Sequence, residues 1–243
     1  MNDDMDDQIR DILENIPERL ILVEQGIDSH IQQEYLKYTN ALDFTQYAEG
    51  DISARIPNLF SPNTSLENKK ETLAILAHQG TLEAYKNIER FLETKEESLE
   101  AWAALALQEC RVFLESSLSD RIGGILMTGL GGENNRIRYF VIIRSRNDAT
   151  LTSAQKETIK LRFSYICSKF NSRIEEIQAH QYYVTIKALI SMDVAVAEII
   201  EGGIAECATF GNFLDENYYV TNAGIPSETE ILHYLEKMGK SEE

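Results

Sequence analysis

The sequence predicts an α+β protein in which an all-helical N-terminal half precedes a small sheet with helices on one face. Two observations support this fold class. Apolar residues recur at three- and four-residue spacing as far as about residue 118, which is the period of an amphipathic helix. Beyond Asp120, short segments of alternating apolar and polar residues, typical of strands, are interspersed with helical ones. We therefore predict two domains, residues 1–120 and 121–243, with the helical domain packed on the sheet.

The chain up to residue 63 predicts three helices and one irregular connection. The apolar stripe of residues 9–16 ends at Pro17, which interrupts a helix. The segment ERLILVEQG predicts a short helix closed by Gly26, and Asp28 is a suitable N-cap for the helix SHIQQEYLKYTNAL. From residue 43 to 63 the periodicity fails, and glycine and proline interrupt the chain. We expect an ordered but irregular connection there.

Residues 64–118 predict three helices in series, and the third is the most apolar segment of the chain. Gly80 suits the end of the first helix, while Thr81 and Ser98 suit the N-caps of the next two. Trp102, the only tryptophan, lies in the middle of the third helix and is expected to be buried. Short antiparallel helices joined by small-residue turns resemble HEAT-like or armadillo-type repeats. This resemblance implies a helical array that binds other proteins.

The C-terminal half predicts the element order β-β-α-β-α-β-α. IGGILMTG and RIRYFVIIRS are expected to form a β-hairpin around the glycine-rich turn GLGGENN. Capping boxes at residues 152–155 and 227–230 predict the starts of two helices. Between them, YYVTIKALIS and NYYVTN predict strands, separated by a helix that Asp193 caps and the glycines 202–203 end. This order is similar to a ferredoxin-like arrangement.

The composition excludes several classes of protein. A hydrophobic fraction of 43% supports a real core and excludes global disorder. No apolar run reaches about 18 residues, so no membrane span is expected, and the acidic first residues are unlike a signal peptide. Cys110, Cys167 and Cys207 are odd in number and far apart, which favours buried thiols over disulfides or a zinc site. The expected location is the cytoplasm.

No motif for catalysis, a cofactor or a metal stands out, so we expect no cofactor and do not favour an enzyme. The turn of residues 129–132 lacks the GK[ST] sequence and the following helix of a phosphate loop, so we interpret it as a hairpin tip. The histidines show neither HExxH nor HxH spacing. They are His30, His78, His180 and His233.

Charge is unevenly distributed along this acidic chain, whose formal net charge is −17. Residues 1–120 carry −14, residues 121–173 carry +7 and residues 174–243 carry −10. Within the basic third, four arginines of the strand 136–146 are expected on one face, because side chains on the same face of a strand recur at every second residue. They are Arg136, Arg138, Arg144 and Arg146.

Three interpretations of these arginines stay open. They pair with the protein's own acidic helices or with solvent, bind an acidic protein partner, or bind a nucleic acid or phosphorylated ligand. Acidic flanks interrupt the basic footprint that phosphate contacts need, so nucleic acid is the least favoured partner. We predict a non-enzymatic cytoplasmic scaffold that binds another protein. The alternatives are an enzyme or ligand sensor that holds a small anion at the arginine face, and a nucleic-acid-associated protein.

Overall fold

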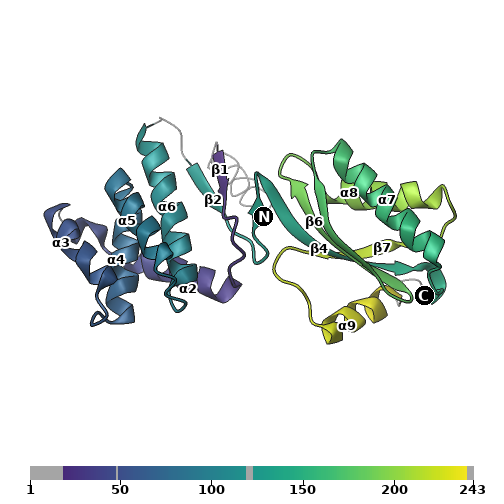
Figure 1. Cartoon of the computed structure of the whole chain (residues 1–243), viewed down its shortest axis with the longest axis horizontal. Coiled ribbons are helices and arrows are strands. Elements are labelled where there is room, and N and C mark those ends of the chain that lie inside the picture. The colour runs from purple at the N-terminus through teal and green to yellow at the C-terminus, as the bar shows by residue number, and fades with distance from the viewer. Residues whose placement is uncertain (1–18, 48, 119–122, 240–243) are drawn as a thin grey trace, which may run out of the picture. The chain divides into compact units, whose positions relative to one another are not determined.

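The computed structural model describes residues 19–47, 49–118 and 123–239, and Figure 1 shows their helices and strands. The chain divides into two compact units. Unit 1 comprises Met1–Val23 and His30–Leu126, and unit 2 comprises Glu24–Ser29 and Met127–Glu243. Helices and an antiparallel sheet are both present, which confirms the predicted α+β class.

Unit 1 combines helices with a two-stranded parallel sheet. Helix α4 packs against α3, α5 and α6, and α6 also contacts strand β2. The elements are β1 (Arg19–Leu22), α2 (Ser29–Ala41), a short 3-10 helix (Phe44–Gln46), α3 (Glu49–Phe60), α4 (Leu66–Gln79), α5 (Leu82–Glu93), α6 (Glu100–Leu118) and β2 (Gly123–Leu126).

The core of unit 1 surrounds Trp102, as the sequence predicts. The Trp102 side chain is only 2% exposed. The rings of Tyr35 and Tyr38 meet it edge-on, with centroids 5.0 and 5.3 Å from its own. Its Nε1 donates a hydrogen bond to the carbonyl oxygen of Lys70 at 3.3 Å. The indole is therefore both packed and hydrogen-bonded, as a buried tryptophan requires.

Two expectations for unit 1 are wrong. Residues 19–22 form strand β1 rather than part of a helix, because they pair in parallel with β2, far along the chain. Residues 49–60 form helix α3 where an irregular connection was expected. Pro57 lies inside α3, and packing offsets the hydrogen bond that proline removes, since Leu59 is fully buried and Phe60 meets the ring of Phe91 edge-on. The predicted helix of residues 9–16 lies outside the described residues.

Unit 2 is built on an antiparallel sheet in the order β5-β6-β4-β7, with the short strand β3 also paired to β4. This is the split β-α-β arrangement of ferredoxin-like folds, so the predicted similarity in order has a structural counterpart. The elements are β3 (Gly132–Glu133), β4 (Arg136–Ser145), a 3-10 turn (Arg146–Asp148), α7 (Ser153–Lys169), β5 (Arg173–Ala179), β6 (Tyr183–Ser191), α8 (Val196–Ala208), β7 (Leu214–Thr221) and α9 (Glu228–Gly239).

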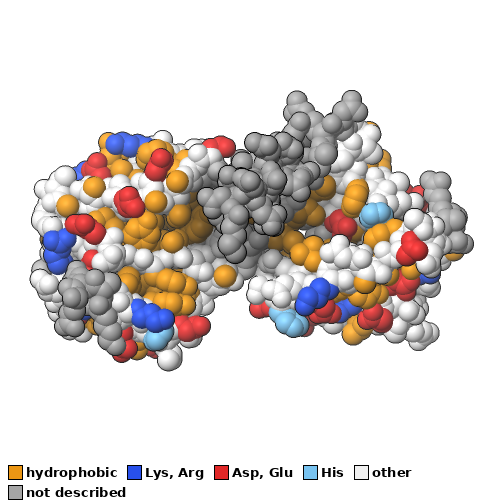
Figure 2. Space-filling model, turned by 180° about the vertical axis from the view of Figure 1, so that it is seen from behind, with side chains coloured by type: hydrophobic (Ala, Val, Ile, Leu, Met, Phe, Trp, Pro, Cys, Tyr) orange, Lys and Arg blue, Asp and Glu red, His pale blue; other side chains and the backbone are white. Residues whose placement is uncertain are grey.

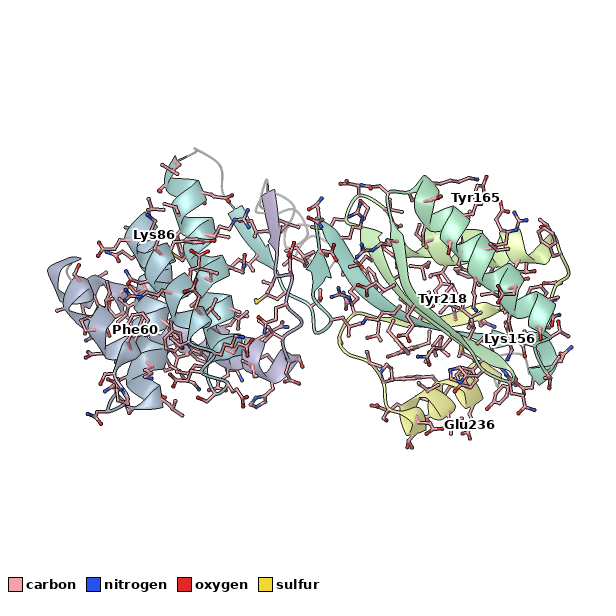
Figure 3. All side chains as sticks on the ribbon, in the orientation of Figure 1. Phe60, Lys86, Lys156, Tyr165, Tyr218 and Glu236 are labelled. Carbon is pink, nitrogen blue, oxygen red and sulfur yellow. The ribbon has the colours of Figure 1, made fainter. Side chains whose placement is uncertain are left out.

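Helices lie on both faces of this sheet and not on one, which corrects the sequence prediction. Helices α7 and α8 lie on one side and α9 on the other (Figure 1). In Figure 3, Lys156 and Tyr165 mark α7, and Glu236 marks α9 on the opposite side. Successive residues of β4 face opposite sides of the sheet, so they pack in different layers. Val141 packs with α7 and α8, whereas Phe140 packs with α9.

Two strand predictions in unit 2 are also wrong. The segment before the glycine-rich turn does not form a hairpin with β4, since its strand β2 pairs with β1. The hairpin partner of β4 is β3, through a turn in which Asn134 and Asn135 have φ of 49° and 63°, as two-residue hairpin turns require. Strand β5 was not predicted, because a bulge between Ile174 and Glu176 interrupts its alternation.

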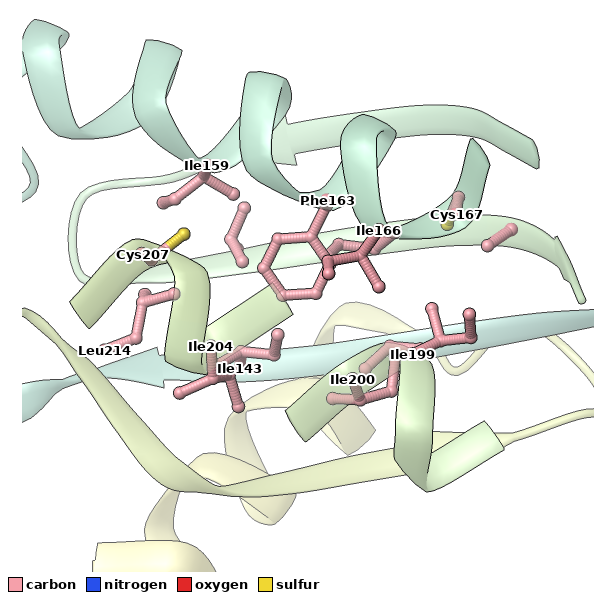
Figure 4. Packing of buried hydrophobic residues seen from close by; sticks show 14 of the residues in the cluster. Ile143, Ile159, Phe163, Ile166, Cys167, Ile199, Ile200, Ile204, Cys207 and Leu214 are labelled. Carbon is pink, nitrogen blue, oxygen red and sulfur yellow. The ribbon is translucent and has the colours of Figure 1, made fainter. Parts of the chain in front are cut away.

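The main core of unit 2 lies between the sheet and the pair α7–α8, and Figure 4 shows its aliphatic residues around the ring of Phe163. Gly202 and Gly203 lie inside α8, not at its end as predicted. The reason is the close approach of α7, because a Cβ on Gly203 would lie 2.4 Å from Cε1 of Phe163. None of the described helices has the length and apolar character needed to cross a membrane.

Candidate functional site

The arginine face of β4 forms only in part. Arg136, Arg138 and Arg144 lie in β4, whose residues alternate between the two layers, whereas Arg146 lies beyond the strand in a 3-10 turn. The guanidinium group of Arg146 makes an ion pair with Glu216 at 3.2 Å. This residue therefore belongs to the end of the sheet.

The other three arginines are held by separate partners. Nε and Nη2 of Arg138 donate to the two carboxylate oxygens of Glu175 at 2.7 and 2.9 Å. Arg144 pairs in the same two-pronged way with Asp148. Arg136 donates to Asn171, to the backbone oxygen and to Oδ1, both at 2.6 Å.

These partners all belong to unit 2, as does Glu216. The pairs therefore give no support to a charge match with the acidic helices of unit 1. Each of the four guanidinium groups pairs with its own neighbour, which gives no support to a common anion clamp.

A different group of side chains meets on the same face of the sheet, on β5 and β6. Along β6, Tyr183, Thr185 and Lys187 alternate with residues of the main core such as Val184 and Ile186. The register places Thr185 between Ile142 of β4 and Gln178 of β5, and Lys187 between Phe140 and Glu176. The sequence prediction includes this strand but assigns no function to either of its faces. The aromatic and polar residues at alternate positions were the signal that it missed.

These residues line a cleft of about 380 Å³ beside the start of α9. Its floor is formed by Phe140, Tyr183, Thr185 and Lys187, with Glu176 and Gln178 on the β5 side. Glu228 and Ile231 of α9 complete the opposite side. The cleft thus combines an aromatic end with hydrogen-bonding side chains, which is the usual composition of a ligand site.

The aromatic end is a stacked pair. The rings of His180 and Tyr183 are nearly parallel, at 9°, with centroids 4.1 Å apart. Burial, together with the positive charge of Lys156, lowers the pKa of His180, although Glu228 opposes this shift. Burial likewise raises the pKa of Tyr183. Both rings are therefore uncharged at neutral pH. Tyr183 is buried at 8% exposure, so His180 is the ring of the pair that is only partly buried.

The far end of the face is rich in charge of both signs. Arg138, with Lys187 and Arg173 further away, lowers the pKa of Glu175, and the hydrogen bond from Arg138 is the largest cause. Lys187 Nζ lies 3.8 Å from Glu175, and Arg173 makes an ion pair with Glu133 at 2.8 Å. On the side of the molecule that Figure 2 shows, Lys and Arg are likewise interspersed with Asp and Glu. Any anion bound here meets a locally positive but not continuously basic surface.

The glycine-rich turn does not offer its amides to an anion. The N–H groups of Leu130, Gly131 and Gly132 donate to the backbone oxygens of Asn222, Thr128 and Glu24, respectively. The turn is also not the hairpin tip that the sequence predicts, because that place is taken by the two asparagines before β4.

No metal centre or activated nucleophile stands out in the described part of the chain. No three His, Cys, Asp or Glu side chains gather there in a way that could hold a metal ion. The three cysteines are buried, as predicted, and burial raises the pKa of each thiol. On β7 and α9, the pKa values of Tyr218 and Tyr234 are also raised, by burial and by a hydrogen bond to Tyr219, respectively. A raised pKa disfavours the anionic form that attacks as a nucleophile.

Comparison with known proteins finds matches among solved structures but none among sequence families. No family model and no curated protein matches the sequence. A crystal structure assigned as a transposase of Deinococcus radiodurans R1 matches with a TM-score of 0.37 and 14% identity, over 44% of this chain and 93% of that one. A REP-associated tyrosine transposase bound to a REP hairpin matches with a TM-score of 0.33 and 9% identity, over 42% of this chain and 63% of that one.

These matches correct the sequence-based view of function. These two structures are transposases and not HEAT-like adaptors, which contradicts the prediction of a non-enzymatic protein-binding scaffold. The ranking of nucleic acid as the least favoured partner is wrong for the same reason. At these TM-scores the matches transfer no activity, and the residues of the chain itself have to support any function.

Proposed function

We propose that unit 2 binds single-stranded nucleic acid on the sheet face beside α9, with an unpaired base in the cleft. The observation that carries the proposal is the stacked pair of His180 and Tyr183 at one end of a cleft whose floor bears Thr185 and Lys187. An aromatic ring with an accessible face binds a base by stacking, at about 1–3 kcal/mol per base, and His180 is only partly buried.

The dimensions of the face suit a short strand. From Tyr183 to Leu189, β6 extends about 20 Å at about 3.3 Å per residue. Arg138 and Arg173 flank Leu189 in the register, so cations lie at the far end from the aromatic pair. A strand that follows β6 would place a base in the cleft beside Lys187. Its backbone phosphates would lie outside the cleft, toward the end of the sheet where Arg138 and Arg173 also pair with Glu175 and Glu133.

Two features define what the proposal includes. A duplex keeps its bases stacked inside, so it cannot place one in the cleft, and binding should favour single strands. The raised pKa values of Tyr218 and Tyr234 give no support to attack by a tyrosine, so the proposal concerns binding and assigns no strand cleavage. One matching transposase is bound to a REP hairpin, and the proposal gives this chain a ligand of the same class, but it rests on the cleft.

The test is fluorescence anisotropy with labelled DNA and RNA oligonucleotides of about 12 nucleotides, single-stranded and duplex. The key variant is Lys187→Gln. Its control is Lys160→Gln, which makes the same change on α7, away from the cleft. The Lys160 side chain is 49% exposed. We expect single strands to bind more tightly than duplexes. Lys187→Gln should weaken binding about three- to tenfold, because the cleft loses its cationic hydrogen-bond donor.

A second variant tests the stacking surface. His180→Ala should weaken binding by about fivefold or more while removing no positive charge at neutral pH, so the salt dependence should not change. Equal binding of single strands and duplexes would contradict the proposal. So would single-strand affinity weaker than about 100 μM, or equal effects of the Lys187 and Lys160 substitutions.

A further inference from the structure

The polar side chains of the cleft are unusually rich in hydrogen-bond acceptors. Glu176 and Glu228 carry carboxylates, which only accept when ionised. Nε2 of Gln178 donates to Oε1 of Glu176 at 2.6 Å, which directs one amide hydrogen of Gln178 away from any ligand. Lys187 is the cationic donor among the lining residues. A ligand group in the cleft must therefore offer several N–H donors and at least one acceptor.

The same carboxylates decide which part of a nucleotide enters. A phosphate would meet Glu176 and Glu228, and like charges repel strongly in a partly enclosed site. A base is neutral and can stack on the aromatic pair. The phosphates are thus directed toward Arg138 and Arg173, outside the cleft.

Among the bases, guanine has the edge that matches this arrangement. Its N1–H and N2 amino group lie side by side and can donate to the two oxygens of one carboxylate, and its O6 lies next to them as an acceptor for an ammonium group. Thymine and uracil offer a single N–H between two carbonyl oxygens. These oxygens would face the carboxylates, which are also acceptors. Cytosine and adenine each offer one amino group without a neighbouring ring N–H.

The register brings the required pair together. Glu176 and Lys187 are direct cross-strand neighbours, and such neighbours have Cβ atoms about 4.5–5.5 Å apart. Both lie on the face that bears the cleft. A carboxylate and an ammonium at this separation can contact adjacent groups on one edge of a single base.

On the basis of the proposed function, we infer that the cleft selects guanine, with Glu176 accepting from N1–H and the N2 amino group and Lys187 donating to O6. The stacked rings of His180 and Tyr183 hold the base at the aromatic end of the cleft. Each good two-pronged contact between a side chain and a base is worth about one to two orders of magnitude in discrimination.

The experiment uses thymidine 12-mers, and matching uridine 12-mers, with one central base changed to guanine, adenine, cytosine, hypoxanthine or 7-deazaguanine. The full-length chain should bind the guanine strand about tenfold more tightly than the others. Hypoxanthine lacks the N2 amino group and should lose most of this preference. 7-Deazaguanine has a C–H group in place of N7, which takes no part in the proposed contacts. It should keep the preference.

A matched pair of variants connects the preference to the residue. Glu176→Gln should remove the preference for guanine, so that the guanine strand and the unsubstituted thymidine strand bind this variant within about twofold of each other. The control Glu157→Gln changes a carboxylate on α7 that is 66% exposed, and should preserve the preference. Guanosine monophosphate is the competitor that distinguishes a strand from a free nucleotide. We expect competition only at much higher concentration than the strand, because it lacks the flanking phosphates.

The outcomes separate the two proposals. Equal binding of all substituted strands, with sensitivity to Lys187→Gln, would overturn guanine selection and leave single-strand binding in place. Guanine preference that survives Glu176→Gln would overturn the assigned contact. Competition by guanosine monophosphate at the concentration of the strand would overturn strand binding and leave guanine recognition. Failure of every strand to bind would overturn both.

Discussion

Two adjacent glycines in α8 allow the packing of unit 2 to be tested with an internal control. A Cβ on Gly203 would lie 2.4–2.6 Å from three ring carbons of Phe163, whereas a Cβ on Gly202 would lie 3.5 Å from the nearest atom, in Ile166. The first distance is a clash, and the second is an ordinary contact. Phe163 is fully buried, so its ring cannot move aside into solvent.

The expected effects follow from these distances. Either change to alanine gains about 0.8–1.0 kcal/mol of helix propensity, because both positions are interior to α8. Gly203→Ala also adds the strain of overpacking a filled core, about 1–3 kcal/mol. The propensity gain is common to both variants, so their difference in the free energy of unfolding measures the strain alone. Gly202→Ala should be the more stable of the two by about 1–3 kcal/mol.

Hydrogen exchange of peptides from α7 and α8, measured on the full chain, is a suitable assay because it reports the opening of these helices separately from unit 1. A difference of about 1.4 kcal/mol appears as a tenfold change in the opening equilibrium. We expect slower exchange in Gly202→Ala and faster exchange in Gly203→Ala. Equal protection of α8 in the two variants would refute the close approach of α7 and α8.

Two further predictions concern the core of unit 1 and an ion pair of unit 2. Trp102→Ala removes a side chain that is 2% exposed and should cost about 3–5 kcal/mol in a urea or thermal melt, so a shift of only a degree or two would be inconsistent with its place in the core. Arg138 lowers the pKa of Glu175 in the folded state. The pair therefore stabilises the protein fully at pH values above the pKa that Glu175 has in the unfolded chain. This stabilisation is lost as the pH falls through the lower pKa of the folded state. Thermal melts from pH 7 to 3 should therefore show a weaker acid destabilisation in Glu175→Gln, by about 0.2–1 kcal/mol, and identical pH profiles would exclude the linkage.

Several helix ends were predicted correctly from the sequence, although Asp193 does not cap α8, whose N-cap is Ala195. Gly80 ends α4 with φ of 57°, and the side chain of Thr81 accepts from the backbone N–H of Ala84 at the start of α5. The capping box of Thr152 and Gln155 forms at the start of α7 as expected. These interactions join residues at most three or four positions apart. The residues that determine them are therefore all visible in one short segment.

The strand partners could not be predicted in the same way. β2 and β4 both have clear strand composition, but β2 pairs with β1 and β4 pairs with β3, β6 and β7. Backbone hydrogen bonds across a sheet are the same for every sequence. The choice among possible partners depends on which pairing buries the most apolar surface in the whole unit, and no single segment contains that information.

The candidate site shows the same division. The sequence by itself determined that arginines recur at alternate positions of β4 and that β6 alternates, because the two-residue period of a strand is a local property. Only the tertiary structure decided that Arg138 is held by Glu175, from a strand whose bulge hides its pattern, and that Lys187 and Tyr183 lie in a cleft beside α9. A charged group or an aromatic ring forms a binding site only together with the side chains around it. Those neighbours come from strands and helices far apart in the chain, which only the packing of the whole unit brings together.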